Sequence, residues 1–144
     1  MTRSDQESDL KVLVEESSGD PSLDLAYICA QSAIDKKGEN LSLLYVGEVC
    51  SFADYFLICS AMSDRQVSAI SDHVVQRMKA ENQPPLSVEG TTEGRWAVLD
   101  FGSVIVHVFL DAIRDYYDIE SLWTDADKVS IPSEFYGPAS ARLN

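Results

Sequence analysis

The pattern of hydrophobic and polar positions divides the chain into a regular central region and two irregular ends. Between residues 21 and 123 apolar residues recur with helix or strand spacing, whereas the ends show little periodicity. Residues 1–20 carry six acidic and two basic side chains with few large apolar ones, a composition typical of disordered segments. We therefore predict an acidic disordered tail at 1–20, one folded domain at 21–123 and a C-terminal tail at 124–144.

Three segments of the central region have the apolar spacing of helices. The first begins at Asp20-Pro21, an N-cap residue followed by proline at the first helical position. The second begins at Ser63, where Gln66 three residues later forms a capping box. The third begins near Asp111. Each pattern predicts a helix that buries one apolar stripe.

Short apolar runs separated by turn residues predict five strands. They cover residues 41–46, 55–59, 86–89, 95–101 and 104–109. The order helix-strand-strand-helix, followed by three strands and a helix, predicts an α+β domain with a mixed five-stranded sheet. We expect the helices to lie mainly on one face of this sheet. Because there are only three helices, part of the other face should stay open.

Alternation along the fourth strand indicates which side chains face this open side. Trp96, Val98 and Asp100 point one way, and the residues between them suit the helix-covered core. Glu89 on the neighbouring strand can face the same side as Trp96. A large aromatic residue among carboxylates on an open sheet face is typical of an interface hot spot. The alternative is that Trp96 is an ordinary core residue or is covered by a tail.

The charge of the chain narrows the class of partner. The 144 residues include 11 Lys and Arg against 24 Asp and Glu, for a net charge of −13 at pH 7. So few cations exclude general nucleic-acid binding, because too few counterions would be released from the phosphate backbone. An acidic protein is instead suited to a partner protein with a basic patch.

The cysteines and the apolar segments indicate the compartment. The chain has an odd number of cysteines, and none shows C-x-x-C spacing. They lie in apolar stretches, which predicts reduced thiols at Cys29, Cys50 and Cys59. No apolar run approaches the ~18 residues of a transmembrane helix, and the acidic start resembles neither a signal nor a transit peptide. We therefore expect a cytoplasmic protein without membrane partners.

No combination of residues predicts catalysis or metal binding. His107 lies in an apolar strand and lacks a second ligand at zinc-site spacing, so we expect a hydrogen-bonded structural histidine. Asp100-Phe101-Gly102 spells a kinase tripeptide without the other kinase motifs, and indicates a strand end with a tight turn. We predict no catalytic residues, no metal and no cofactor.

Several segments together resemble a known family, and each is a weak signal alone. They are Asp54-Tyr55-Phe56-Leu57-Ile58, Ser63-Asp64-Arg65-Gln66, Val88-Glu89-Gly90, Gly94-Arg95-Trp96, Asp100-Phe101-Gly102, Val106-His107-Val108-Phe109 and Arg114-Asp115-Tyr116-Tyr117-Asp118-Ile119-Glu120-Ser121-Leu122-Trp123. In order and spacing they resemble the ribosomal silencing factor, or Iojap, family. The resemblance covers roughly residues 21–123, about the size of one domain.

The resemblance implies a protein that is not an enzyme. Members of the family bind the large ribosomal subunit through its ribosomal protein fourteen and block joining of the small subunit, which represses translation. The family's fold is a sandwich distantly similar to nucleotidyltransferases, and free members form homodimers.

The resemblance also implies a set of partner-binding residues. Carried over to this sequence, they are Trp96, Asp100, Glu89, Gly90, Val98 and Tyr55. Two alternatives stay open, a nucleotidyltransferase-like enzyme and a dimeric adaptor for another basic protein. The first rests on analogy of fold alone.

Overall fold

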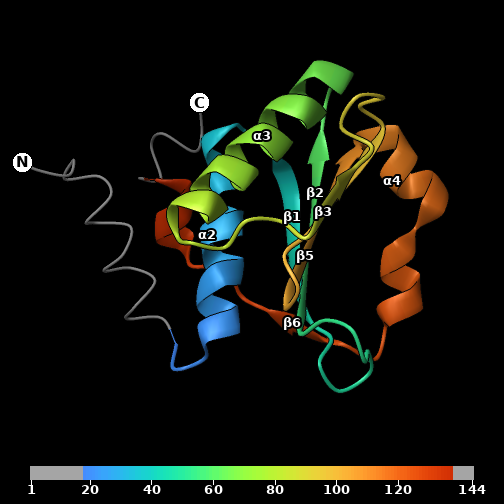
Figure 1. Cartoon of the computed structure of the whole chain (residues 1–144). Coiled ribbons are helices and arrows are strands. Elements are labelled where there is room, and N and C mark those ends of the chain that lie inside the picture. The colour runs from blue at the N-terminus through green and yellow to red at the C-terminus, as the bar shows by residue number, and fades with distance from the viewer. Residues whose placement is uncertain (1–17, 138–144) are drawn as a thin grey trace, which may run out of the picture.

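The computed structural model describes residues 18–137 and shows a mixed sheet between two layers of helix. The strands are β1 (Glu39–Tyr45), β2 (Tyr55–Ala61), β3 (Ser87–Glu89), β4 (Trp96–Asp100), β5 (Val104–Leu110) and β6 (Asp127–Val129). The helices are α2 (Pro21–Asp35), α3 (Asp64–Ala80) and α4 (Asp111–Tyr117), with 3-10 turns η1 (Ile119–Trp123) and η2 (Ser133–Tyr136). Helices α2 and α3 cover one face of the sheet, and α4 lies on the other (Figure 1).

The sheet has the strand order β3-β4-β5-β2-β1-β6. Strands β2 and β5 pair in parallel at its centre, and all the other neighbouring strands pair antiparallel. The expected α+β fold with a mixed sheet is therefore confirmed, whereas the expected number of five strands was wrong. The sixth strand, β6, adds to the outer edge of β1 and lies inside the segment 124–144. Its three residues have no alternation of their own, so only the pairing with β1 identifies them as a strand.

Two helices begin where their capping residues predict. The Asp20 carboxylate accepts a hydrogen bond of 3.0 Å from the Ser22 backbone N–H at the start of α2. The Ser63 hydroxyl accepts one of 3.1 Å from the Gln66 N–H at the start of α3. These side chains satisfy backbone donors that have no partner within the helix. They fix the ends of the two helices that cover one face of the sheet.

The two faces of the sheet are buried in different ways. The face under α2 and α3 carries the larger apolar cluster, which includes Ala97 and Leu99 of β4, as the alternation predicted. The opposite face carries a smaller cluster in which aromatic side chains pack around Phe56 and Phe109. Strands β2 and β5 are apolar on both faces and contribute to both clusters. Part of the second face is therefore covered by side chains instead of by a helix.

Arg114 attaches the short helix α4 to the sheet. Its guanidinium donates to the Asn40 carbonyl at 2.7 Å and to the Ser60 hydroxyl at 3.0 Å. It also forms a bidentate salt bridge with the Glu120 carboxylate, in which Nε and Nη2 each donate to one carboxylate oxygen at 3.0 Å. Asn40 has a φ of 51° at a register shift in β1, so its carbonyl is turned away from the regular ladder. One buried side chain thus joins α4, η1, β1 and β2.

We expect Arg114→Ala to lower the free energy of unfolding by about 2–4 kcal/mol, because it removes a part-buried ion pair and leaves the Asn40 carbonyl without its donor. Urea unfolding measures this change. Arg65→Ala is the matched control, since Arg65 is exposed, and should change stability by less than about 0.5 kcal/mol. Equal losses in the two variants would contradict the assigned role of Arg114.

Candidate functional site

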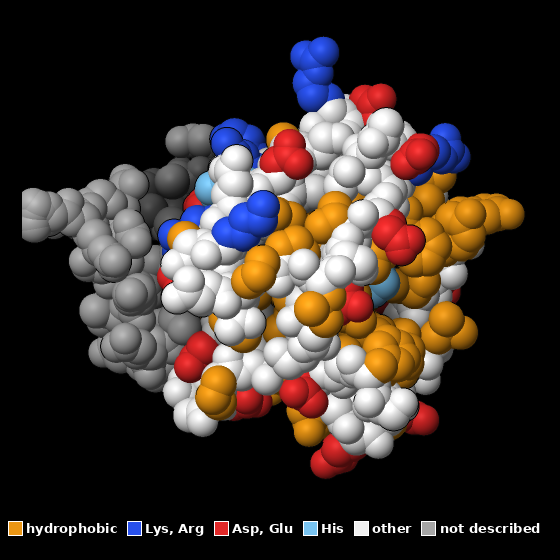
Figure 2. Space-filling model, in the orientation of Figure 1, with side chains coloured by type: hydrophobic (Ala, Val, Ile, Leu, Met, Phe, Trp, Pro, Cys, Tyr) orange, Lys and Arg blue, Asp and Glu red, His pale blue; other side chains and the backbone are white. Residues whose placement is uncertain are grey.

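The face of the sheet opposite α2 and α3 carries a continuous set of aromatic rings. We call it the aromatic surface; its members are Phe52, Phe56, Trp96, His107, Tyr116, Tyr117 and Trp123. They come from the loop after β1, from β2, β4 and β5, and from α4 and η1. Figure 2 shows hydrophobic side chains gathered on the side of the molecule where α4 lies, with acidic side chains among them.

One end of the aromatic surface is built around Trp96. Its indole stacks on Phe109 with a centroid distance of 4.8 Å, and it contacts Tyr117 at 4.9 Å. Tyr116 packs edge-on against Tyr117 at 5.0 Å and is 79% exposed. Trp96 itself is only half-buried. The expected placement of Trp96 on the second face is thus observed, but Phe109 and Tyr117 cover much of its ring.

The other end of the aromatic surface is built around Phe56. Its ring is edge-on to Trp123 at 5.0 Å and to His107 at 5.3 Å. Phe52, in the loop between β1 and β2, lies 6.2 Å from Phe56 and is 62% exposed. The ring contacts therefore run without a break from an exposed phenylalanine at one end to an exposed tyrosine at the other.

His107 lies at the middle of the aromatic surface and is almost fully buried. The Trp96 indole N–H donates to its Nδ1 atom at 3.2 Å. Because the indole nitrogen can only donate, Nδ1 must accept, and the proton of the neutral imidazole lies on Nε2. Burial lowers the pKa of His107 to about 4, so the ring is neutral at pH 7. The expectation of a hydrogen-bonded histidine in a central strand is confirmed.

A cavity of about 650 Å³ opens between β4 and α4 at the Trp96 end. Its lining includes the aromatic residues Trp96, Tyr116 and Tyr117 and the charged residues Glu93 and Arg95. It combines aromatic walls with a charged rim, so it can receive a side chain from a partner protein.

Four of the sequence-derived site residues lie on β3 and β4 or directly after β3. Val98 and Asp100 share its face of β4, and Glu89 is exposed on β3 opposite Val98. The Asp100 carboxylate accepts a hydrogen bond of 2.8 Å from the Gly102 N–H, which holds the turn after β4. Gly90 has a φ of +82°, and a Cβ there would lie 2.0 Å from the Trp96 carbonyl oxygen. Any larger residue at this position would displace the backbone of Trp96.

The structure does not bring Tyr55 to this surface. Its side chain is buried in the cluster under α2, on the opposite side of the sheet from Trp96. The Tyr55 hydroxyl donates to the Asp20 carboxylate at 2.7 Å. Burial, the first cause, and this hydrogen bond both raise the pKa of Tyr55. Tyr55 therefore joins β2 to the first turn of α2.

The sequence interpretation missed Phe52, Tyr116 and Trp123 as members of the surface. Their positions in the chain are far apart, and they meet only because β2, α4 and η1 pack together. The adjacent tyrosines of α4 were the available signal, because a seven-residue helix cannot bury two large neighbouring rings on one stripe.

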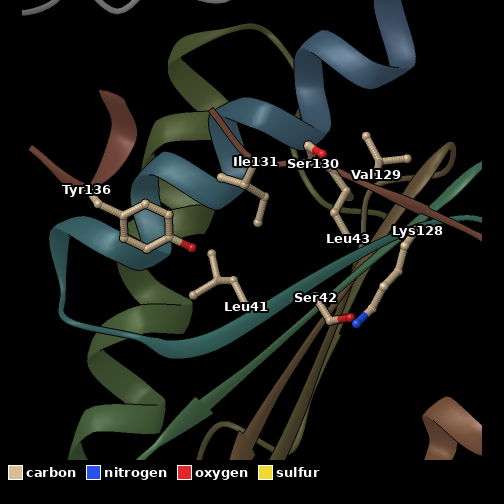
Figure 3. Close-up of a pocket in the computed structure, with 8 residues that line it drawn as sticks. All are labelled: Leu41, Ser42, Leu43, Lys128, Val129, Ser130, Ile131 and Tyr136. Carbon is tan, nitrogen blue, oxygen red and sulfur yellow. The ribbon is translucent and has the colours of Figure 1, made fainter. Parts of the chain in front are cut away.

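A second cavity lies at the far edge of the sheet, between β1, β6 and η2. It has a volume of about 290 Å³, and Figure 3 shows Leu41, Ile131 and Tyr136 pointing toward one another across it.

No group of three His, Cys, Asp or Glu side chains within residues 18–137 is placed to hold a metal ion. In the same range no helix is long and apolar enough to span a membrane.

Comparison with known proteins identifies relatives over most of the chain. The family described as "Ribosomal silencing factor during starvation" matches residues 19–142. The ribosomal silencing factor of Bacillus subtilis is 39% identical over 99 residues, which are 69% of this chain and 84% of that protein. The chloroplastic protein Iojap of Zea mays is 32% identical over 111 residues, 76% of this chain and 48% of that protein.

Solved structures support the same relationship. A crystal structure of a Chromobacterium violaceum protein matches with a TM-score of 0.70 and 30% identity, covering 85% of this chain and 98% of that one. A Bacillus halodurans crystal structure gives a TM-score of 0.68 and 31% identity, covering 75% and 98%. The fold described above is thus shared with experimentally determined relatives.

The buried His107 makes stability depend on pH. Its pKa is about 4 in the folded protein and 6.5 in the unfolded chain, so between these values the unfolded chain binds more protons. The contribution of the neutral ring is fully present above pH 6.5 and is lost as the pH falls toward 4. We expect wild-type stability to fall by about 2 kcal/mol more than that of His107→Leu between pH 7 and pH 5. Urea unfolding of both proteins measures this, and a pH-independent difference would contradict it.

Proposed function

The chain belongs to the ribosomal silencing factor family, and on that premise we propose that it binds the large ribosomal subunit and blocks joining of the small subunit. The proposed contact is the subunit's ribosomal protein fourteen, and the proposed site is the aromatic surface with the acidic residues beside it. Occupying the joining surface represses translation without any chemical step. The observation that carries the proposal is this large aromatic surface, which α4 covers only in part.

The chemistry of the aromatic surface supports a protein partner. Tyr116 and Phe52 are 79% and 62% exposed, although aromatic side chains are usually at least partly buried. Clustered aromatic residues are typical hot spots, since each offers a large apolar area with few rotatable bonds. A stable contact buries about 1,200–2,000 Å² in total. Together with the 650 Å³ cavity, the aromatic surface supplies a centre for such a contact.

Charge supports a basic partner. The chain carries a net charge of −13. Glu89 of β3 and Glu93 of the turn before β4 lie near Trp96, and Asp100 lies at the far end of β4. A ribosomal protein with basic side chains would be attracted to this face before contact. Acidic groups placed around an apolar centre raise the association rate constant, and the aromatic rings lower the dissociation rate constant. In this proposal the protein acts in the cytoplasm, and the free homodimer stays a prediction.

Co-sedimentation with isolated ribosomal subunits tests the proposed function. We expect the wild-type protein to sediment with the large subunit and not with the small one. Adding small subunits afterwards should give fewer joined ribosomes than in its absence, because the joining surface is occupied. Failure to sediment with the large subunit at low salt would overturn the proposal. Recovery of a different basic partner would favour the adaptor alternative.

Truncating one exposed ring tests whether the aromatic surface is the contact. We expect Tyr116→Ala to weaken binding to the large subunit by at least about 1 kcal/mol, roughly fivefold in Kd. Tyr136→Ala is the matched control, because Tyr136 is a partly exposed tyrosine of η2 near the other edge of the sheet. Equal affinities of the two variants for the subunit would exclude Tyr116 from the contact.

The acidic face predicts a salt effect on the kinetics of binding. Raising the ionic strength from about 50 to 300 mM should lower the association rate constant more than it raises the dissociation rate constant, because ions screen the attraction before contact. Surface-immobilised large subunits allow both rate constants to be measured. An association rate constant that does not change with salt would contradict electrostatic attraction as the cause of fast binding.

A further inference from the structure

We propose that His107 is a positioning residue for partner binding, whose Nδ1 atom holds the Trp96 indole in a fixed orientation at the aromatic surface. The interaction that carries this proposal is the hydrogen bond of 3.2 Å from the indole N–H to Nδ1. The effect on binding rests on the proposed function, whereas the orientation of the indole is a property of the free protein. The two parts can therefore be tested separately.

The ring packing around Trp96 does not by itself fix the orientation of the indole. Phe109 stacks on it at 4.8 Å with an interplanar angle of 24°, and Tyr117 contacts it at 4.9 Å with an angle of 44°. Such contacts do not select one orientation, because offset-stacked and edge-to-face arrangements of rings are both favourable. A hydrogen bond to one atom of the indole edge is directional. It selects the rotamer that points the N–H toward His107 on β5.

The other ring nitrogen of His107 indicates what the residue is for. Nε2 carries the proton of the neutral ring, is buried, and has no hydrogen-bond partner among the described residues. An unpaired buried donor destabilises the fold, a cost that leucine at this position would avoid. The benefit of the imidazole must therefore come from Nδ1, whose hydrogen-bond donor among residues 18–137 is the Trp96 indole.

No second acceptor replaces His107 in the part of the chain that the structure describes. The Trp96 N–H bonds to Nδ1 alone. Because Trp96 is half-buried, water is close enough to compete for its N–H once Nδ1 is removed. The indole would then turn outward, which breaks its contact with Tyr117 and changes the wall of the cavity. A partner would have to restore the original rotamer on binding and would bind less tightly.

Two substitutions separate positioning from packing. His107→Leu fills the apolar space but removes the acceptor, whereas His107→Asn leaves a smaller side chain whose Oδ1 lies close to the place of Nδ1. A purely structural role predicts that leucine is tolerated better than asparagine. The positioning role predicts the opposite order for the orientation of Trp96 and for binding. Urea unfolding confirms that each variant is folded before either comparison.

Proton–nitrogen NMR of the free protein tests the orientation. The chain has two tryptophans, so two indole N–H signals are expected, and Trp123→Phe assigns the signal of Trp96. We expect His107→Leu to shift the Trp96 signal and speed its exchange with solvent at least tenfold. His107→Asn should keep the signal near its wild-type position. An unchanged Trp96 signal in folded His107→Leu would overturn the proposal.

Binding to the large ribosomal subunit tests the consequence. We expect His107→Leu to raise Kd threefold to tenfold and His107→Asn to restore most of the affinity. Trp96→Phe removes the donor and keeps a ring, so adding His107→Leu to it should have little further effect. Full affinity of His107→Leu would overturn the role in binding. Absence of wild-type binding would overturn the proposed function, while the NMR result would still decide the orientation.

Discussion

The parallel pairing of β2 with β5 is the constraint on which the rest of the structure depends. Both strands are apolar on both faces, so water must be excluded from two sides of the sheet at once. Helices α2 and α3, of 15 and 17 residues, do this on one side. The other side has only the seven residues of α4 and the turn η1. Aromatic side chains shield the remaining area, which makes the proposed binding surface a consequence of the fold.

A helix as short as α4 can cover part of a sheet face only if contacts other than its own apolar stripe hold it in place. Isolated seven-residue helices are unstable in water, because too few hydrogen bonds repay the cost of nucleation. Arg114 supplies the attachment through polar contacts to β1, β2 and η1. Since the anchor is a buried side chain on one face, Tyr116 and Tyr117 on the same helix are free to project outward. The attachment of α4 and the exposure of its tyrosines therefore have one cause.

The sequence predicted those elements that local physics determines. Capping residues located the starts of α2 and α3, and alternation along β4 separated Trp96 from the core residues beside it. Strand β6 was missed because three residues without periodicity become a strand only by pairing with β1. The position of Tyr55 was not evident either. Alternation shows which residues share a face, but only packing against α2 decides which face is covered.

In the candidate site the packing of the rings allows several orientations, whereas the hydrogen bonds are directional and select one. Stacked rings supply area, but area alone does not fix the shape that a partner meets. At the centre of the aromatic surface one imidazole, kept neutral by burial, gives the indole of Trp96 a defined orientation. Gly90 contributes in a different way, because the absence of a Cβ lets the loop after β3 approach the Trp96 carbonyl. Side chain and backbone of Trp96 are thus fixed independently, and a surface that is ordered before contact loses less entropy when a partner binds.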